Sequence, residues 1–126
     1  MRKIDYKVGL LEPHKYKLDL LKNDTLWFKG AIMKLNFEWD EEKAKENDKK
    51  HRVSFDEATT VFIDPFSITK PDPDHSVKEE RYIDIGSSDK GRVLVVVYVE
   101  RGSNIRIISC RKATLSERKL YEEGIN

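Results

Sequence analysis

An uninterrupted apolar run, Val93–Val99, places the strongest constraint on the fold of this chain of 126 residues. A strand with one solvated face alternates apolar and polar residues, whereas this run of valine, leucine and tyrosine does not. It therefore predicts a central strand that is covered on both sides. The segments Arg81–Ile85 and Ile105–Arg111 alternate, and turn residues separate them from the run at hairpin spacing. We expect an antiparallel β-meander around this strand.

Further local signals extend this pattern on the N-terminal side. Leu35–Trp39 alternates apolar and polar residues and predicts a short strand. Asp40 follows it and can cap a helix over about Glu41–Lys50, with acidic residues in the first turn where the helix dipole favours them. The Pro-rich segment 64–78 reads as a loop with a short strand at Phe66–Thr69.

Two capping boxes mark the other helices. Ser54 can accept a hydrogen bond from the Glu57 amide while the Glu57 carboxylate reaches back, which starts a helix over Phe55–Phe62. Thr114-Leu115-Ser116-Glu117 repeats this pattern before a C-terminal helix, Leu115–Glu123. The order is strand, two helices, antiparallel meander and helix. This order predicts an α+β domain with helices packed on an antiparallel sheet.

Residues 1–32 differ from the rest of the chain, and residues 33–126 read as a complete domain that begins at Met33. In the first segment leucines alternate with lysines, and Pro13 can open a helix over Leu11–Lys22. Two interpretations stay open. The segment is either an extension ahead of a domain that starts at Met33, or a helical arm that packs on the domain.

Composition favours a soluble, cytoplasmic protein. The single cysteine, Cys110, excludes an internal disulfide and the thiolate clusters of zinc ribbons and iron–sulfur sites. No apolar run approaches the roughly 20 residues that span a bilayer. The longest weakly apolar stretch near the N-terminus, Val8–Leu11, is shorter than the core of a secretory signal.

Several kinds of catalytic site have no signature here. The sequence has no phosphate-binding loop, no dinucleotide glycine fingerprint and no nucleophile elbow. Its histidines are scattered, and none is paired at helical metal-binding spacing. Asp72, Asp74 and His75 could bind a divalent ion, but a solvated Pro-rich loop is the simpler interpretation. We expect neither a metal nor a cofactor.

The distribution of charge is more informative than the net charge of +1. Residues 33–80 carry eight basic and thirteen acidic side chains, whereas residues 81–126 carry nine basic and six acidic ones. Six of the eight arginines lie between Arg81 and Arg118. The positive charge therefore gathers on the predicted meander and the helix after it.

The segment from Arg101 to Lys112 contains no acidic residue. On a regular strand Ile105, Ile107, Ser109 and Arg111 share one face, and Arg106, Ile108, Cys110 and Lys112 share the other. Arg81 and Arg92 join them from neighbouring strands. Several guanidinium groups with hydroxyls nearby predict a phosphodiester site, because the arginine fork binds phosphate oxygens bidentately.

Simpler interpretations compete with that site. Surface strands often carry arginines paired with acids, here Glu80, Glu100 and Glu117, and spacing alone favours this view. Cys110 fits a small buried residue better than a nucleophile, since no histidine is near it in sequence. His51 can cap a helix C-terminus or act as a general acid–base.

Four motifs in order resemble the BrnT toxins of bacterial and archaeal type II toxin–antitoxin modules. The resemblance runs from Met33 to about Tyr121. The motifs are Phe37-Glu38-Trp39-Asp40-Glu41-Glu42-Lys43-Ala44, Lys50-His51-Arg52-Val53-Ser54-Phe55-Asp56-Glu57-Ala58 with Val61-Phe62-Ile63-Asp64-Pro65, Glu80-Arg81-Tyr82-Ile83-Asp84-Ile85-Gly86, and Ile105-Arg106-Ile107-Ile108-Ser109-Cys110-Arg111-Lys112-Ala113 with Glu117-Arg118 and Tyr121. Two positions depart from the family pattern. Arg52 replaces a glycine, which strains the turn if its φ is positive, and Cys110 replaces an alanine.

The resemblance implies a RelE-like fold and a ribonuclease that blocks translation when it is free. It also implies a BrnA-type ribbon-helix-helix antitoxin as partner, and operator DNA is contacted only through the toxin–antitoxin complex. The residues that match family motifs are the catalytic candidates Arg81, Arg101, Arg111, Lys112 and His51 and the substrate-binding candidate Arg106. Arg92 and Ser109 join Arg106 as substrate-binding candidates from the strand pattern.

The expected reaction uses no metal: the RNA 2′-hydroxyl attacks the adjacent phosphorus while arginines stabilise the phosphorane. We expect Arg111 and Arg81 as phosphate ligands with Arg101 beside them, and Lys112 or His51 as the proton carrier. Glu80 is an outside candidate and fits an ion-pair partner better. Two other functions stay open: a degenerate toxin that only binds antitoxin and operator, and a protein adaptor that uses the acidic 33–80 half.

Overall fold

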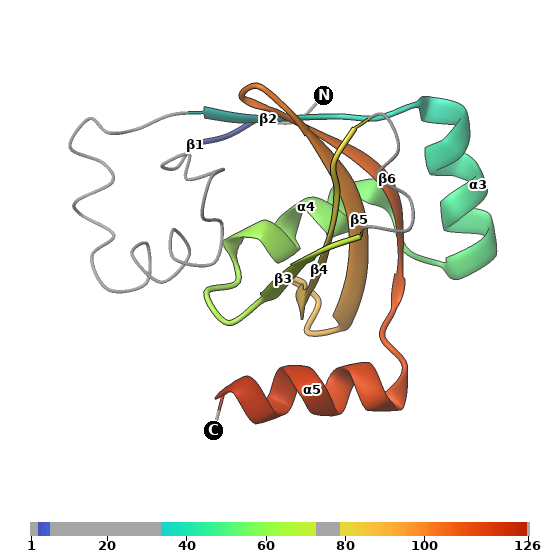
Figure 1. Cartoon of the computed structure of the whole chain (residues 1–126). Coiled ribbons are helices and arrows are strands. Elements are labelled where there is room, and N and C mark those ends of the chain that lie inside the picture. The colour runs from blue at the N-terminus through green and yellow to red at the C-terminus, as the bar shows by residue number, and fades with distance from the viewer. Residues whose placement is uncertain (1–2, 6–33, 73–78, 126) are drawn as a thin grey trace.

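The computed structural model describes residues 3–5, 34–72 and 79–125 and has an α+β fold (Figure 1). Six described strands form one sheet in the order β1-β2-β6-β5-β4-β3. The strands are β1 (Lys3–Asp5), β2 (Lys34–Glu38), β3 (Ile68–Pro71), β4 (Arg81–Ser87), β5 (Val93–Arg101) and β6 (Asn104–Lys112). The helices are α3 (Glu41–His51), α4 (Phe55–Thr60), the 3₁₀ turn η1 (Val61–Ile63) and α5 (Leu115–Ile125). No described helix has the length and apolar character that crossing a membrane requires.

The apolar run becomes β5, which lies between β4 and β6 and pairs antiparallel with both. The predicted meander and central strand are therefore confirmed. Two strands extend the sheet beyond β6: β2 pairs with it in parallel, and β1 pairs antiparallel with β2. Lys3–Asp5 thus adds a strand from the N-terminal segment. The helix predicted over Leu11–Lys22 lies outside the described residues, and the division at Met33 stays a prediction.

Local capping explains where the helices begin. The Asp40 side chain accepts hydrogen bonds from the amides of Glu42 and Lys43, at 2.9 and 3.1 Å, and α3 follows. Ser54 Oγ accepts from the Glu57 amide at 3.0 Å, as predicted. The expected return contact of the Glu57 carboxylate is wrong, because that carboxylate binds Arg92 and Ser88.

The remaining element predictions differ from the structure only at their ends. The helix predicted over Phe55–Phe62 consists of α4 followed directly by the 3₁₀ turn η1. The short strand predicted at Phe66–Thr69 lies two residues later, as β3. The second capping box is complete. Thr114 Oγ1 accepts from the Glu117 amide, and the Glu117 carboxylate accepts from the Thr114 amide at 2.8 Å.

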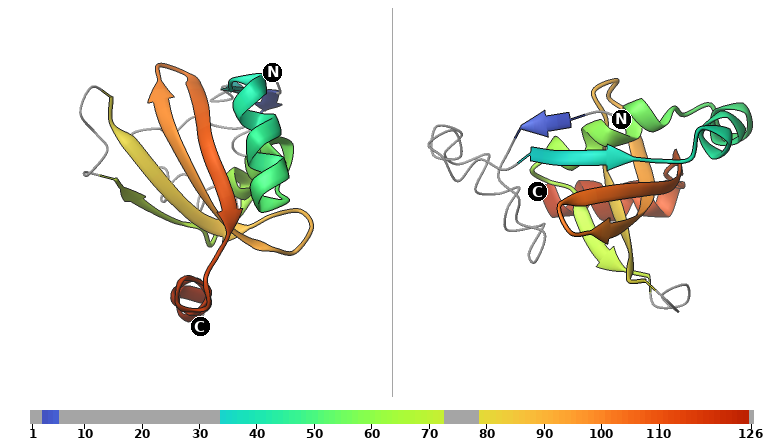
Figure 2. Two further views of the ribbon diagram at one scale, coloured as in Figure 1. Left: turned by 90° about the vertical axis from the view of Figure 1, so that its right-hand side faces the viewer. Right: turned by 90° about the horizontal axis from the view of Figure 1, so that it is seen from above.

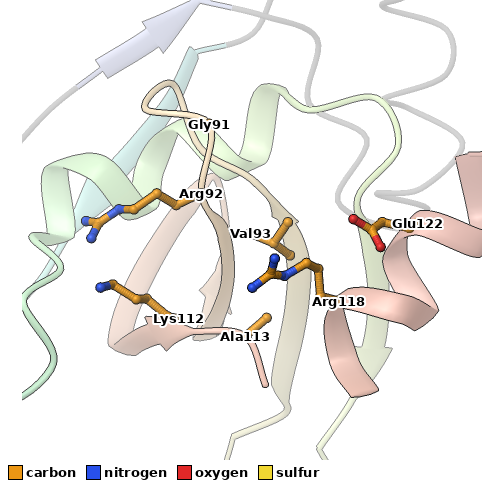
Figure 3. Close-up of a pocket in the computed structure, with 7 residues that line it drawn as sticks. All are labelled: Gly91, Arg92, Val93, Lys112, Ala113, Arg118 and Glu122. Carbon is orange, nitrogen blue, oxygen red and sulfur yellow. The ribbon is translucent and has the colours of Figure 1, made fainter. Parts of the chain in front are cut away.

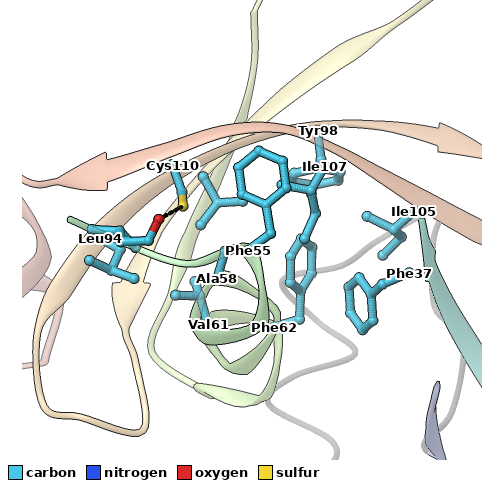
Figure 4. Close-up of a cluster of buried hydrophobic side chains, with 12 residues drawn as sticks. Phe37, Phe55, Ala58, Val61, Phe62, Leu94, Tyr98, Ile105, Ile107 and Cys110 are labelled. Atoms are coloured by element: carbon cyan, nitrogen blue, oxygen red, sulfur yellow. Dashed lines mark hydrogen bonds between the residues drawn. The ribbon is translucent and has the colours of Figure 1, made fainter. Parts of the chain in front are cut away.

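The two faces of the sheet are covered differently. We call the side packed by α3 and α4 the helix face. Its core joins β5 and β6 to α4 and includes tilted and edge-on contacts of Phe62 with Phe37 and Tyr98, at 5.1 and 4.8 Å between ring centroids (Figure 4). We call the other side the α5 face, where Tyr121 packs with Ile85 and Val95. Figure 2 shows α5 at the end where β6 finishes.

A β-bulge corrects the predicted alternation of β6. Tyr98 pairs with Ile107 and Val97 pairs with Ser109, so Ile108 is an extra residue without a partner on β5. The side-chain direction therefore shifts by one position after Ile107. Cys110 joins Ile105 and Ile107 in the helix-face core instead of lying opposite them. Arg106 and Arg111 consequently share the α5 face, and Lys112 lies on the helix face.

Candidate functional site

Three of the predicted site residues lie together on the α5 face near the β5–β6 hairpin. Arg81 and Arg106 flank Val99 in the registers of β4, β5 and β6, and Arg101 ends β5. We call Arg81, Arg101 and Arg106 the hairpin-end arginines. Their fields act together on Glu79: its hydrogen bond with Arg101 lowers its pKa most, and the charges of Arg106 and Arg81 lower it further.

Acidic side chains already neutralise part of this group. Arg101 donates from Nε and Nη2 to the two carboxylate oxygens of Glu79, at 2.8 and 3.0 Å. Arg106 donates to Glu38 at 3.2 Å. Ion pairing was expected, but with Glu80, Glu100 and Glu117. The partners Glu38 and Glu79 come from segments distant in sequence, so strand spacing gives no signal for them.

Arg111 lies further along β6 and is held by α5. Its Nη1 and Nη2 donate to the two carboxylate oxygens of Glu117 at 2.8 and 2.9 Å. This hydrogen bond is the main reason that the pKa of Glu117 falls to about 2. Here the predicted acidic partner is confirmed. Ser109 is half-buried on the same strand, opposite Val97.

Arg92 is fixed on the helix face by a buried carboxylate. Glu57 is only 4% exposed and accepts from Arg92 Nε at 3.0 Å and from Ser88 Oγ at 2.7 Å, and Arg92 Nη2 makes a second contact to it. The hydrogen bond from Arg92 holds the pKa of Glu57 below its usual range. Arg92 Nη2 also donates to the Arg52 carbonyl at 3.2 Å, which ties it to the turn after His51.

A pocket of about 360 Å³ lies where β5 begins, β6 ends and α5 starts, and we call it the end pocket. Its lining residues are Gly91, Arg92, Val93, Lys112, Ala113, Arg118 and Glu122. Figure 3 shows Arg92 and Lys112 extending in the same direction and Arg118 reaching from α5 toward the strands. The lining therefore carries three cations and a single carboxylate, a charge balance suited to an anion, although Arg92 and Lys112 extend away from Arg118.

Two cations of the end pocket have no competing partner inside the described part of the chain. The Lys112 ammonium and the Arg118 guanidinium form no ion pair or hydrogen bond with another described side chain. This separates them from Arg101, Arg106 and Arg111, which are each held by a carboxylate. Arg118 was not among the predicted site residues. The second capping box places it in the first turn of the C-terminal helix, and that was the available signal.

His51 is the last residue of α3 and is half-buried. Arg52 follows it in the left-handed conformation, with φ 60° and ψ 34°, and caps the helix. The strained turn expected from the missing glycine is therefore present. Because Arg92 contacts the Arg52 carbonyl, the His51 turn lies at the edge of the same region as the end pocket.

Cys110 has no nucleophilic role in this arrangement. It is fully buried, and burial raises the pKa of its thiol to about 12. Asn47 on α3 holds its backbone with a donated and an accepted hydrogen bond, at 2.9 and 3.1 Å. The prediction of a small buried residue is confirmed.

Acidic residues gather on the helix face toward the β5–β6 hairpin, away from the end pocket. Burial, helped by the charges of Asp84 and Glu80, raises the pKa of Glu100 to about 7, and its Oε1 is buried without a hydrogen-bond partner. Asp84 is fully buried and accepts from Tyr98 and Thr69 at 3.0 and 2.7 Å. Sequence reasoning did not find this group, because its members meet only across the strand registers.

The structure separates the predicted site residues into distinct groups. Arg81, Arg101 and Arg106 lie at the hairpin end, whereas Arg92 and Lys112 line the end pocket. His51 precedes Arg52, whose carbonyl Arg92 contacts. Among the described residues, no group of three or more histidine, cysteine or acidic side chains is placed to hold a metal ion. Asp74 and His75, considered as metal ligands, lie outside the described residues.

Two of three comparisons with known proteins find a match, and the family is shown by the first. A family model described as the ribonuclease toxin BrnT of type II toxin–antitoxin systems matches residues 39–117. Among solved structures, the chain is similar to the Brucella abortus ribonuclease toxin BrnT, with a TM-score of 0.52 and 24% identity. The match covers 64% of this chain and 97% of that one, and at this identity it concerns the fold alone. No curated protein matches the chain.

Proposed function

The chain belongs to the BrnT family of ribonuclease toxins of type II toxin–antitoxin systems, and we propose that its end pocket binds the RNA phosphate that is cleaved. The observation that carries this proposal is the cavity lined by Arg92, Lys112 and Arg118. Three of the side chains that line it are cationic, and one is a carboxylate. The hairpin-end arginines support a weaker role, since a phosphate there must displace Glu79 or Glu38.

The neighbours of the pocket give each cation a part in binding. Glu57 orients Arg92 from behind, so this guanidinium loses little additional conformational entropy when a phosphate arrives. Lys112 and Arg118 supply charge that is not engaged in an ion pair with any described carboxylate, although Glu122 also lines the pocket. Arg111 is adjacent in sequence to Lys112 and can contact the phosphate only by sharing its fork with Glu117. We therefore rank Lys112 above Arg111 as the principal phosphate contact.

The reaction needs no metal. The RNA 2′-hydroxyl loses its proton and its oxygen attacks the adjacent phosphorus, the bond from phosphorus to the 5′-oxygen breaks, and that oxygen takes up a proton. The products are a 2′,3′-cyclic phosphate and a free 5′-hydroxyl. Cations around the phosphate stabilise the charge that develops on the phosphorane. His51 is the proposed proton carrier, because it precedes Arg52 at the turn that Arg92 contacts and an imidazole can act as a general acid or base.

The partner we propose is a BrnA-like ribbon-helix-helix antitoxin. Released from it in the cytoplasm, the toxin cleaves RNA and inhibits translation. Operator DNA is bound only through the toxin–antitoxin complex. The family designation supports an antitoxin, and its ribbon-helix-helix type is inferred from the sequence resemblance.

Alanine variants from the two cationic groups locate the site. We expect Lys112→Ala and Arg118→Ala to lower kcat/KM on a labelled single-stranded RNA by about 100-fold. Arg101→Ala, from the hairpin end, should retain activity within a few-fold, and the exposed Lys119→Ala on α5 is the matched control. Full activity of Lys112→Ala with loss of activity in Arg101→Ala would move the site to the hairpin end.

Two further measurements test the chemistry. Cleavage should persist in excess EDTA, and mass spectrometry should find a 2′,3′-cyclic phosphate on the upstream product. Cleavage that stops when the metal is removed, or a product with a 3′-hydroxyl, contradicts the proposed reaction.

One observation favours a second candidate, a catalytically degenerate toxin that only binds its antitoxin and operator complex. Arg101, Arg106 and Arg111 are all engaged by carboxylates of the same chain. Expression with and without the antitoxin separates the two functions. Growth arrest that co-expression relieves supports the nuclease, and the absence of toxicity from a folded protein supports the binding module.

A further inference from the structure

Helix α5 buries one side chain against the sheet, and the Glu117–Arg111 ion pair joins it to β6 as well. Tyr121 is 6% exposed and is the only buried residue among those described in α5. The apolar side chains of Leu115, Leu120 and Ile125 on the same helix are exposed by 67%, 46% and 44%. Burial of apolar surface therefore does little to define where α5 lies, except at Tyr121.

The Tyr121 hydroxyl has a fixed partner. It donates to Asp64 Oδ2 at 2.6 Å, while its ring packs with Ile85 and Val95. Burial, followed by the hydrogen bond to Asp64, raises the pKa of Tyr121 above its ordinary value, so the hydroxyl keeps its proton and remains a donor. This hydrogen bond to a carboxylate is of the stronger, charge-assisted kind.

Asp64 is itself held rigidly. Its Oδ2 also accepts from the Ser87 amide at 2.7 Å, and its Oδ1 accepts from the Phe66 amide at 2.9 Å. Close packing fixes the segments that supply these amides: a Cβ added at Gly86 would lie only 2.7 Å from Ser67 Cβ. Tyr121 is therefore anchored to a carboxylate that has little freedom to move.

The preceding turn of α5 contributes a lining residue to the end pocket. Arg118 lies three residues before Tyr121 and Glu117 lies four residues before it, and these spacings place side chains on one side of a helix. Arg118 lines the pocket and Glu117 grips Arg111. The anchor and the pocket wall are therefore one helical turn apart.

We propose that Tyr121 is a positioning residue: through its hydrogen bond to Asp64 it sets the place of α5 and so the distance of Arg118 from Lys112 across the end pocket. This inference rests on the proposed function of the pocket. Tyr121 itself contacts neither the phosphate nor the reacting atoms. Its hydrogen-bond partner, Asp64, also lies outside the pocket lining.

The test uses Tyr121→Phe, which keeps the packed ring and removes only the donor. Tyr82→Phe is the matched control, because the Tyr82 hydroxyl makes the same kind of bond, to Glu80 at 2.7 Å, elsewhere on the sheet. We expect Tyr121→Phe to lower kcat/KM on RNA about tenfold, mainly through KM, with Tyr82→Phe within twofold of the parent. Amide hydrogen exchange in α5 should quicken in Tyr121→Phe and stay unchanged in Tyr82→Phe.

A double variant distinguishes positioning from a general loss of stability. If Tyr121 acts through Arg118, the substitution Tyr121→Phe should have less than a twofold effect when Arg118→Ala is already present. A full tenfold effect in that background, unchanged exchange in α5, or activity equal to the parent overturns the inference. If the parent protein itself fails to cleave RNA, the proposed function fails, and the exchange of α5 then decides the anchoring on its own.

Discussion

Asn47 joins α3 to β6 by hydrogen bonds between its buried side-chain amide and backbone groups. Its Nδ2 donates to the carbonyls of Val53 and Cys110 at 3.0 and 2.9 Å, and its Oδ1 accepts from the Cys110 amide at 3.1 Å. The side chain is 7% exposed, so these hydrogen bonds are shielded from solvent. Asn47→Ala leaves these three backbone groups without their partner in a dry environment.

The expected loss follows from these contacts. A buried polar group left unsatisfied costs about 1–3 kcal/mol, and three such groups that can partly relax give a total of about 4 kcal/mol. Alanine favours the helix over asparagine by about 0.7 kcal/mol, which offsets part of that loss. We expect Asn47→Ala to lower the free energy of unfolding by about 3 kcal/mol. This is a large share of the stability of a small domain.

Urea unfolding followed by circular dichroism measures this difference, with an unchanged m-value as the condition for comparing variants. Asp48→Ala, one residue along on the exposed side of α3, should stay within about 0.5 kcal/mol of the parent. Asn47→Asp keeps the volume and the acceptor but loses both donors, so it should also destabilise the fold. A loss below about 1 kcal/mol for Asn47→Ala would refute the reasoning, because the backbone groups would then be satisfied without the side chain.

Three further predictions concern other parts of the molecule. The raised pKa of Glu100, about 7 against an ordinary 4.5, means that the folded state holds a proton that the unfolded state has lost between these values, so stability falls as pH rises from about 4.5 through 7. Glu100→Gln should remove this dependence and stabilise the protein by about 1–2 kcal/mol at pH 8.5, after allowance for the partly exposed side chain, with no gain at pH 4; urea unfolding at both values measures it. Arg52→Gly should raise the free energy of unfolding by about 1 kcal/mol, because φ at this position is 60°, whereas Lys50→Gly inside α3 should lower it by about as much; thermal unfolding that gives both variants the same sign contradicts the strain. Glu57→Gln should cost about 3 kcal/mol and lower RNA cleavage, since Arg92 loses a buried charged partner, and a variant of parental stability and activity would show that Glu57 does not hold Arg92 in place.

Local signals predicted the elements of this fold well. Asp40, Ser54 and Thr114 each cap a helix within three residues of themselves, so their effect is visible in a short stretch of sequence. The apolar run of β5 is equally local. Because such features depend on neighbouring residues alone, the order of strands and helices around the meander can be derived from the amino-acid sequence.

Contacts between residues distant in sequence could not be predicted, and the grouping of the site residues depends on such contacts. The side-chain directions of Arg111 and Lys112 depend on a bulge set by the pairing of β5 with β6. Likewise, the carboxylate of Glu57 completes no capping box because Arg92, 35 residues away, takes it. The sequence therefore predicted one phosphate site, whereas the structure places the hairpin-end arginines and the end pocket apart from each other.

At the bulge at Ile108, the length of β6 can change without moving the side chains that follow to the other face of the sheet. Removing Ile108 would let Ser109 follow Ile107 in a regular ladder, and Arg111 and Lys112 would keep their present faces. Removing Val95 from the regular part of β5 would instead move every side chain on one side of the deletion to the opposite face of the sheet. A one-residue length change is thus absorbed a few residues before the end pocket, so the strand that supplies Lys112 can vary in length while the pocket keeps its charge.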